Sequence, residues 1–367
     1  MPAPLHPSPA ADAPFAWRAD SFGTTSPWLR PLSAQELSGL DALASQDAAR
    51  THDAHDPGEP APMPAACEAL AADMRRAVYR GPGFILLRGL PYERWGVDGA
   101  RWVTWTLAHA LGTPVTQTAA GARLVDVRDL SRKESSPRQF STSQELRLHM
   151  DPASDLIGLG CVRAAASGGE SVLTSAVSIH DEMLRQQPEL LAALYEGFRW
   201  HRFGEGRPQD GPISEPDVPV FTREGGHIAC RYVRSPIVAG HKEAGEPLTA
   251  RQIQALDLFD QVAASPQLRI VLRMQPGDLL WVNNIKVLHA RTQFVDHPEP
   301  LPPRHLFRLW VAAPETEARA PARLNYFNGG ACGMPLTGQK ARYDMEALRK
   351  DPASGGVFDL GVSRGGA

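Results

Sequence analysis

The sequence predicts a mainly β fold with helical decoration, arranged as a β-sandwich or a jelly roll. Short apolar runs bounded by Gly and Pro recur between residues 123 and 312, which is the pattern of many short strands joined by turns. Segments with helical spacing are few, and they do not alternate regularly with these runs. A Rossmann fold or a TIM barrel needs such an alternation, so both are disfavoured.

Composition narrows the class of protein. The chain has 367 residues, of which 43% are hydrophobic and 22% charged, and its formal net charge is -3. These values are typical of a globular protein with room for one large domain or two. There is no stripe of Lys and Arg to bind nucleic acid and no apolar run long enough to span a bilayer. We therefore expect a small-molecule substrate, no nucleic acid and no membrane, while the oligomeric state stays open.

The N-terminus and the cysteines indicate a cytoplasmic protein. The first residues, "MPAPLHPSPAADAP", contain neither the basic region nor the apolar region of a signal peptide. The cysteines are far apart and form no CxxC pair, so neither a disulfide framework nor a zinc knuckle is expected of Cys67, Cys161, Cys230 and Cys332.

The first hundred residues contain a predicted tail and the first helices. Residues 1–30 are rich in Pro and Ala and are expected to form a disordered tail, followed by a single domain over residues 31–367. A helix is predicted to start at Ser33, because Glu36 three residues later completes a capping box. Further on, the patterns predict a helix over 66–78, a strand within 83–91 and a helix over 98–112.

Strands dominate the rest of the chain, with two helical regions among them. The segment "SAVSIHDEMLRQQPELLAALYEG" is predicted to form two helices divided by Pro188, and residues 249–264 form another. The predicted strands are 123–128, 146–149, 156–163, 170–174, 198–203, 219–222, 227–230, 268–273, 278–282, 286–290 and 305–312.

A histidine and a carboxylate stand two residues apart at the end of one predicted strand. In "LRLHMD", alternation sends His149 and Asp151 to the same face, where they can hold a metal ion or a proton network. A bare His-x-Asp is also an ordinary strand end followed by a turn. The rest of the chain has to decide between these interpretations.

The late strands supply further candidates. His289 follows Asp151 by 138 residues in "PGDLLWVNNIKVLHART", and "PPRHLFRLWV" then carries Arg304 and Arg308. Two histidines and one carboxylate form the facial triad that binds non-haem Fe(II) and leaves coordination positions open. Each residue alone has a plainer explanation: a core histidine, or a surface cation. The arginines, however, lie among apolar residues, and a buried arginine needs an anionic partner.

With these motifs in place, the sequence resembles the taurine dioxygenase (TauD/TfdA) family of Fe(II)/2-oxoglutarate-dependent dioxygenases, in the clavaminate-synthase-like superfamily. The resemblance covers about residues 80–313 and depends on "GFILLRGLP", "LGTPV", "LHMD", "GGESVLTSAVSIHDEML", "PGDLLWVNNIKVLHART" and "RHLFRLWV". It implies a double-stranded β-helix, or jelly roll, as the core of a single catalytic domain, with a helical insertion after the HxD strands.

The resemblance also implies roles for individual residues. The family's metal ligands match His149, Asp151 and His289. Its cofactor is Fe(II), with 2-oxoglutarate and O2 as co-substrates. The arginine that binds the distal carboxylate of 2-oxoglutarate matches Arg304, helped by a hydroxyl that is Ser171 here, where the family has threonine. Arg308 matches a residue near the C1 carboxylate and the substrate. The link between His289 and Arg304 is longer than in taurine dioxygenase.

The implied reaction hydroxylates, or desaturates, an unactivated C–H bond of a small polar substrate and releases succinate and CO2. An anionic substrate is one option. Asp151 favours hydroxylation, because related halogenases have a small residue in its place. The candidate substrate contacts are Arg308, Tyr232, Arg234 and Gln117.

Some alternatives stay open at this stage. The chain could be a metal-dependent non-oxidative enzyme of the hydrolase kind, or a non-catalytic jelly-roll binding protein. Asn283 and Asn284 either orient His289 or form a turn, and the turn is preferred. Asp126 and Arg128 are interpreted as half-exposed strand residues, and no motif selects the substrate.

Overall fold

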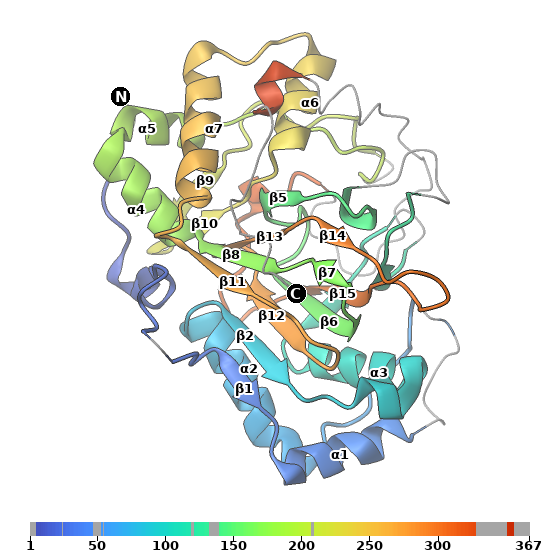
Figure 1. Cartoon of the computed structure of the whole chain (residues 1–367). Helices are drawn as coiled ribbons and strands as arrows, with labels where there is room; N and C mark the ends of the chain where they lie inside the picture. The colour runs from blue at the N-terminus through green and yellow to red at the C-terminus, as the bar shows by residue number, and fades with distance from the viewer. Residues whose placement is uncertain are drawn as a thin grey trace.

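Two β-sheets and their connecting helices organise the chain (Figure 1). The structure is a computed structural model, and it describes residues 5–23, 25–46, 53, 55–118, 121–131, 139–206, 209–327 and 351–355. Cys332 lies outside these residues.

The larger sheet has seven strands in the order β1-β2-β12-β6-β15-β3, with β4 also paired to β15. All its pairs are antiparallel except β1 with β2. Its central strands are apolar on both faces, because helices cover the outer face and the second sheet faces the inner one. The strands are β1 (Leu29–Pro31), β2 (Phe84–Arg88), β3 (Thr113–Val115), β4 (Leu124–Val127), β6 (Leu156–Arg163), β12 (Leu279–Asn283) and β15 (His305–Ala312).

The smaller sheet has four antiparallel strands in the order β11-β8-β13-β5. They are β5 (Leu146–His149), β8 (Ser171–Ser175), β11 (Arg269–Leu272) and β13 (Val287–Arg291). One apolar cluster joins the two sheets through side chains such as Leu288 and Leu306. Two short hairpins lie beside them: β9 (Phe221–Glu224) with β10 (His227–Cys230), and β7 (Ser167–Gly168) with β14 (Phe294–Val295).

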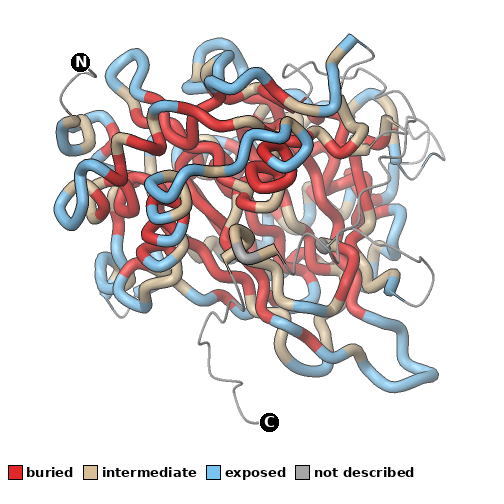
Figure 2. The backbone as a smooth tube through the Cα atoms, turned by 90° about the horizontal axis from the view of Figure 1, so that it is seen from above, coloured by how far each residue is buried: buried red, intermediate tan, exposed pale blue. Residues whose placement is uncertain are grey.

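The helices form two groups. One group packs on the outer face of the larger sheet and comprises α1 (Ala34–Ala44), α2 (Glu68–Arg80) and α3 (Tyr92–His109). The other packs together at the far end of the smaller sheet, beside α6 (Arg234–Ala244), and comprises α4 (Ala176–Gln186), α5 (Pro188–Glu196) and α7 (Ala250–Ala263) (Figure 1). Figure 2 shows the buried backbone running through the centre and the exposed segments around it.

Most predicted elements are present. The capping box of Ser33 and Glu36 starts α1, and Pro188 separates α4 from α5. Helix α3 begins earlier than predicted and is kinked at Gly96, whose φ of 67° suits only glycine. Helix α6 was not predicted, because no side chain caps its N-terminus. The strand predicted over 198–203 is reduced to two isolated bridges.

The helical share is larger than predicted. More of the described residues lie in helices than in strands, so this part of the chain is a mixed helix and sheet structure rather than a mainly β one. The prediction underestimated the helices because α6 and the first turns of α3 have no sequence signal for a helix start.

Part of the tail that was expected to be disordered over residues 1–30, namely residues 10–17, packs against the core. Residues Ala10–Phe15 form a 3-10 helix, in which Asp12 and Phe15 are buried. Trp17 is buried as well and donates a hydrogen bond from Nε1 to the carbonyl of Pro82 at 2.7 Å. A Pro-rich composition lowers helix content but does not prevent such contacts with a core. Among the described residues, no helix is long and apolar enough to cross a membrane.

Candidate active site

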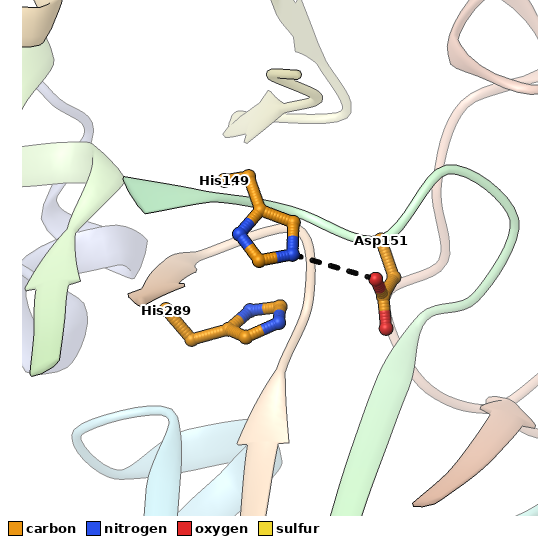
Figure 3. A group of neighbouring side chains, drawn as sticks. All are labelled: His149, Asp151 and His289. Carbon is orange, nitrogen blue, oxygen red and sulfur yellow. Dashed lines mark ion pairs between the residues drawn. The ribbon is translucent and has the colours of Figure 1, made fainter. Parts of the chain in front are cut away.

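The structure brings together the three residues that the sequence predicted as metal ligands (Figure 3). His149 ends β5, Asp151 follows it, and His289 lies in the middle of β13 directly opposite His149. The two imidazole rings are 4.2 Å apart, and His149 Nε2 is 3.7 Å from Asp151 Oδ1. One potential ligand atom from each residue lies within 4.8 Å of the others.

The protonation states suit metal binding. His149 Nδ1 lies 2.7 Å from the carbonyl of Arg147, which can only accept a hydrogen bond, so Nδ1 carries the proton and Nε2 is free to bind a metal. Burial, together with the neighbouring His149, lowers the pKa of His289 to about 3 and leaves it neutral. Burial alone would raise the pKa of Asp151, but Arg308 and the imidazoles hold it well below its usual range.

Side chains from the strand β15, from the turn after β12 and from the position after β10 hold Asp151 in place. Its backbone N–H donates to Asn284 Oδ1 at 2.9 Å, and its carbonyl accepts from Asn284 Nδ2 at 2.7 Å and from Arg231 Nη1 at 2.5 Å. On the side chain, Trp310 Nε1 donates to Oδ2 at 2.6 Å, so Oδ1 remains available to a metal. Asn284 therefore orients Asp151, and neither interpretation of the asparagine pair anticipated this.

The donor set suits a catalytic metal ion with open coordination positions. Two neutral imidazoles and one carboxylate on one side of the site match the facial triad of non-haem iron and leave positions open for other ligands. His289 Nδ1 is buried, and no described residue bonds to it. Residues of this chain therefore fit an iron ion.

Arg304 is placed to bind an anion beside the site. It directly precedes β15, the strand that carries Arg308, and its guanidinium stacks over the ring of Phe294 at 5.0 Å. Its Nη1 is buried, and within the described part of the chain no group accepts a hydrogen bond from it. Burial lowers the pKa of Arg304. A buried guanidinium of this kind fits a carboxylate ligand, which would satisfy its free N–H groups.

The glycine turn before Ser171 lies against Arg304. Gly169 has a φ of 77°, and a Cβ at this position would lie 3.4 Å from Arg304 Nε. Ser171 is buried, and its hydroxyl lies 3.6 Å from Met274 Sδ, a weak acceptor. The structure thus places the "GGES" turn beside Arg304 and leaves the hydroxyl of Ser171 without a strong partner among the described residues.

A cavity of about 140 Å³ opens next to His149 and Asp151. This volume has room for on the order of ten water molecules, which suits a small ligand. Its walls combine aromatic side chains with polar and charged ones, and are formed by Gln117, Thr118, Phe140, Leu146, His149, Asp151, Pro152, His201, Phe203, Glu205, Val233, Ser235, Pro236, Arg308, Trp310, Tyr326 and Phe327.

Two predicted substrate contacts line this cavity and hold each other. Arg308 Nε donates to Gln117 Oε1 at 2.8 Å, and Gln117 Nε2 donates back to the carbonyl of Arg308 at 2.9 Å. The guanidinium lies over the ring of Phe140 at 4.3 Å, and Nη1 is 3.7 Å from Asp151 Oδ2. No described residue accepts a hydrogen bond from Nη2, so Arg308 keeps a donor for a ligand.

The other two predicted contacts do not reach the cavity. Tyr232 is buried, and its hydroxyl donates to Asp260 at 2.6 Å. Arg234 forms ion pairs with Asp257 at 2.6 Å and Asp260 at 2.7 Å. Neither residue lines the cavity in this structure, because Arg234 begins helix α6 instead of extending a mouth loop, and both side chains turn toward α7. Their neighbours Val233 and Ser235 line the cavity instead.

The C-terminal segment after β15 supplies a wall that sequence reasoning missed. Tyr326 and Phe327 line the cavity, and Tyr326 stacks on Trp200 with ring centroids 4.7 Å apart. Asp155 holds this segment, since its carboxylate accepts backbone N–H groups of Ala313 at 2.9 Å and Ala320 at 2.7 Å. Only the cluster of aromatics after the last predicted strand could have indicated this.

Asp126 and Arg128 stay outside the cavity, as the interpretation of them as strand residues expected. Asp126 accepts hydrogen bonds from Arg101 at 3.0 Å and from His305 at 2.8 Å on the outer side of β15. Burial alone would raise its pKa, but these partners lower it well below the usual range. The cluster ties α3 to β15, the strand that carries Arg308.

Comparison with known proteins identifies the class. The family model described as taurine catabolism dioxygenase TauD, TfdA family matches residues 54–310. The chain therefore belongs to the TauD/TfdA family. It is an Fe(II)/2-oxoglutarate-dependent oxygenase. Among the described residues, the group that could hold the iron consists of His149, Asp151 and His289.

Relatives differ in what their names say they do. FR-33289 synthase of Streptomyces rubellomurinus is 31% identical over 248 residues, which are 66% of this chain and 72% of that protein. A uridine-5'-phosphate dioxygenase of Amycolatopsis sp is 28% identical over 238 residues, 60% of this chain and 82% of that protein.

A solved structure of asparagine oxygenase with Fe(II), 3-hydroxyasparagine and succinate has a TM-score of 0.57 and 22% identity, covering 78% of this chain and 93% of that one. The non-heme iron oxygenase OrfP with Fe and alpha-ketoglutaric acid also has a TM-score of 0.57, with 16% identity, covering 82% of this chain and 99% of that one. These similarities show a shared fold.

Proposed function

We propose that the protein hydroxylates a C–H bond of a small polar substrate that carries an anionic group. In the reaction, 2-oxoglutarate and O2 are converted to succinate and CO2, and one oxygen atom enters the substrate. The observation that carries the proposal is the side-by-side placement of His149, Asp151 and His289 with the cavity that Arg308 lines. Desaturation is the second outcome that this site supports: a second hydrogen leaves the neighbouring atom, a double bond forms, and the oxygen atom ends in water instead of in the substrate.

The three converging residues are proposed to hold Fe(II), with His149 contributing Nε2 and Asp151 contributing Oδ1. Bound iron, 2-oxoglutarate and O2 together supply the oxidation of an unactivated C–H bond. The protein's own contribution is orientation and exclusion of water. Trp310, Asn284 and Arg231 keep Asp151 in position, and the apolar core between the sheets surrounds His289.

Arg304 is proposed to bind the distal carboxylate of 2-oxoglutarate, with Ser171 as a second donor. The buried Nη1 of Arg304 and the poorly satisfied hydroxyl of Ser171 support this assignment. A planar guanidinium binds both oxygens of a carboxylate at once, which fixes the orientation of the co-substrate as well as its affinity.

Arg308 is proposed to meet the anionic group of the substrate. It is buried, it lines the cavity, and Gln117 fixes its orientation while leaving Nη2 for a ligand. Arg308 Nη1 lies 3.7 Å from Asp151 Oδ2, so a substrate held by Arg308 would lie close to an iron ion bound to that carboxylate. The relative named uridine-5'-phosphate dioxygenase acts, by its name, on an anionic molecule, and this supports the proposal.

Aromatic walls are proposed to select the rest of the substrate. Phe140, Phe203, Trp310, Tyr326 and Phe327 all line the cavity. Such walls bind planar or apolar groups through their ring faces. The substrate is therefore proposed to combine an anion with an apolar part that fits a small volume.

The fold and the domain organisation complete the proposal. We propose that the two facing sheets are the double-stranded β-helix of the family, at about residues 80–313. The helices α4 and α5 follow the HxD strands as the expected helical insertion. Because residues 10–17 pack on the core, the catalytic domain is proposed to include them instead of beginning at residue 31.

The experiment is a screen of small carboxylates, sulfonates, phosphates and amino acids for stimulated release of succinate and CO2 from 2-oxoglutarate under air with Fe(II). Each active acid is then compared with its neutral amide or ester. Acids that stimulate release while their neutral partners do not would support the proposal. Equal stimulation by acids and neutral partners would contradict the anionic group of the proposed substrate. If no Fe(II)-dependent release occurs, either with a test compound or without one, the oxidative function is contradicted.

A further inference from the structure

A buried ion pair joins the N-terminal segment to the turn between β12 and β13. Lys286 Nζ lies 2.5 Å from Asp12 Oδ1, and the two side chains are 1% and 0% exposed. Lys286 also donates to the carbonyl of Ile228, and Asp12 Oδ2 accepts from the backbone N–H of Ile228 at 2.6 Å. Both charges are therefore paired with each other and satisfied further by the backbone of β10.

The N-terminal segment has several other contacts at the same place. The carbonyl of Phe15 accepts from the hydroxyl of Ser175 at the end of β8, and the carbonyl of Trp17 accepts from Ser178 at 2.6 Å. The ring of Phe15 lies 5.1 Å from Lys286 Nζ. The family model begins only at residue 54, so this segment lies outside the part that it matches.

The turn that contains Lys286 is connected to two of the proposed metal ligands, Asp151 and His289. Asn284 in this turn binds the backbone of Asp151 on both sides, as described above. Lys286 is followed at once by β13, which carries His289 three residues later. The carbonyl of Lys286 accepts from the backbone N–H of Ala176, which ties the turn to the start of α4.

We propose that the N-terminal segment Ala10–Trp17 is a positioning element of the metal centre, acting through the Asp12–Lys286 pair on the turn that orients Asp151 and His289. Without Asp12, a buried ammonium group would be left unpaired, and the turn would have to move or admit water to satisfy it. The two ligands would then no longer be held in one geometry. This proposal rests on the assignment of His149, Asp151 and His289 as the iron ligands.

The test uses the full-length protein and three variants. Asp12→Asn and the double variant Asp12→Asn with Lys286→Met break the pair, and the double variant leaves no lone buried charge if the single one fails to fold. Asp181→Asn is the control, because Asp181 binds Ser8 N at 2.8 Å, just before the segment, and no described contact joins it to the turn. The measurements are the Fe(II) dissociation constant without O2, amide hydrogen exchange of residues 284–291 in the metal-free protein, and the melting temperature.

Both pair-breaking variants are expected to weaken Fe(II) binding by about tenfold, the effect of losing a residue that orients a ligand, and to speed exchange over residues 284–291. Asp181→Asn is expected to change the melting temperature at most. If the folded double variant binds Fe(II) like the wild type and shows unchanged exchange, the segment is only structural and the proposal is wrong. If the wild type itself does not bind Fe(II), the proposed function fails instead.

Discussion

The indole of Trp310 donates a hydrogen bond to Oδ2 of Asp151 at 2.6 Å, although 159 residues separate them in the sequence. Trp310 also lines the substrate cavity, so one side chain touches both the carboxylate and the space where a substrate would lie. The contact directs Oδ1 toward the two histidines and links β15 to the metal site.

Replacing this indole should weaken the site without unfolding the protein. In Trp310→Phe the ring stays but the donor is lost, and we expect Fe(II) affinity to fall about tenfold. Trp281→Phe is the control, because Trp281 is fully buried in the same sheet and its Nε1 has no partner among the described residues. Equal Fe(II) affinities of the two variants, measured by titration without O2, would show that the Trp310 hydrogen bond is unimportant.

The neighbouring asparagines offer a sharper comparison. Both are buried, but Asn284 binds the backbone of Asp151, whereas Asn283 Nδ2 donates to the carbonyl of Val78 at 3.0 Å. Either change to alanine should lower the free energy of unfolding by about 1–3 kcal/mol, since buried groups lose partners. Only Asn284→Ala should also weaken Fe(II) binding. Similar metal affinities in two variants of similar stability would argue against a positioning role for Asn284.

Arg304 should determine the affinity for 2-oxoglutarate. Truncating one partner of a buried charged pair costs about 2–5 kcal/mol, and about 1.4 kcal/mol is a factor of ten, so Arg304→Ala should weaken 2-oxoglutarate binding at least tenfold. Arg304→Lys keeps the charge but loses the planar fork, and should have an intermediate affinity. The dissociation constant, measured with Fe(II) in the absence of O2, checks this. An unchanged value in Arg304→Ala would assign the arginine another role.

The C-terminal wall should affect substrate choice and little else. Phe327→Ala enlarges the cavity beside Trp310, whose ring centroid is 6.3 Å from that of Phe327. We expect larger compounds to stimulate succinate release from this variant, while its affinity for 2-oxoglutarate stays within about twofold of the wild type. The same compound library, run on both proteins, gives the comparison. Identical stimulation profiles would show that Phe327 does not select the substrate.

Asp126 should make stability depend on pH. Its pKa is lowered in the folded protein, so the stabilisation is present above the unfolded pKa of about 3.9 and is lost as the pH falls through the lower folded value. The wild type should exceed Asp126→Asn in free energy of unfolding near pH 7, and the difference should shrink below about pH 4. Denaturant unfolding at several pH values measures it. A difference that stays constant down to about pH 3 would contradict the cluster with Arg101 and His305.

The metal ligands could be predicted from sequence because strand alternation is a local rule. The two-residue spacing predicts His149 and Asp151 on the same face of a strand. His289 was predicted from the motif of a second, later strand. The order of these motifs was enough to indicate the family. Nothing local, in contrast, links Asn284 or Trp310 to Asp151, because these contacts depend on which strands become neighbours.

The differences between the expected and the observed positions have the same origin. Tyr232 and Arg234 were expected at the cavity because an extended chain would have sent them to one face, but the backbone turns into α6 at Arg234. The N-terminal segment was expected to be disordered because its composition does not show that Asp12 meets a buried lysine 274 residues later. Tyr326 and Phe327 reach the cavity through long-range contacts of the C-terminal segment, such as those with Asp155 and Trp200.

The central claim is that His149, Asp151 and His289 hold the catalytic iron beside the cavity that Arg308 lines. Anomalous diffraction at the iron edge, from crystals grown with Fe(II) and 2-oxoglutarate in the absence of O2, tests it most directly. The account predicts one strong peak in contact with His149 Nε2, Asp151 Oδ1 and a nitrogen of His289, and no such peak in His289→Ala. A peak at another group of residues, or full occupancy of this site in the variant, would contradict it.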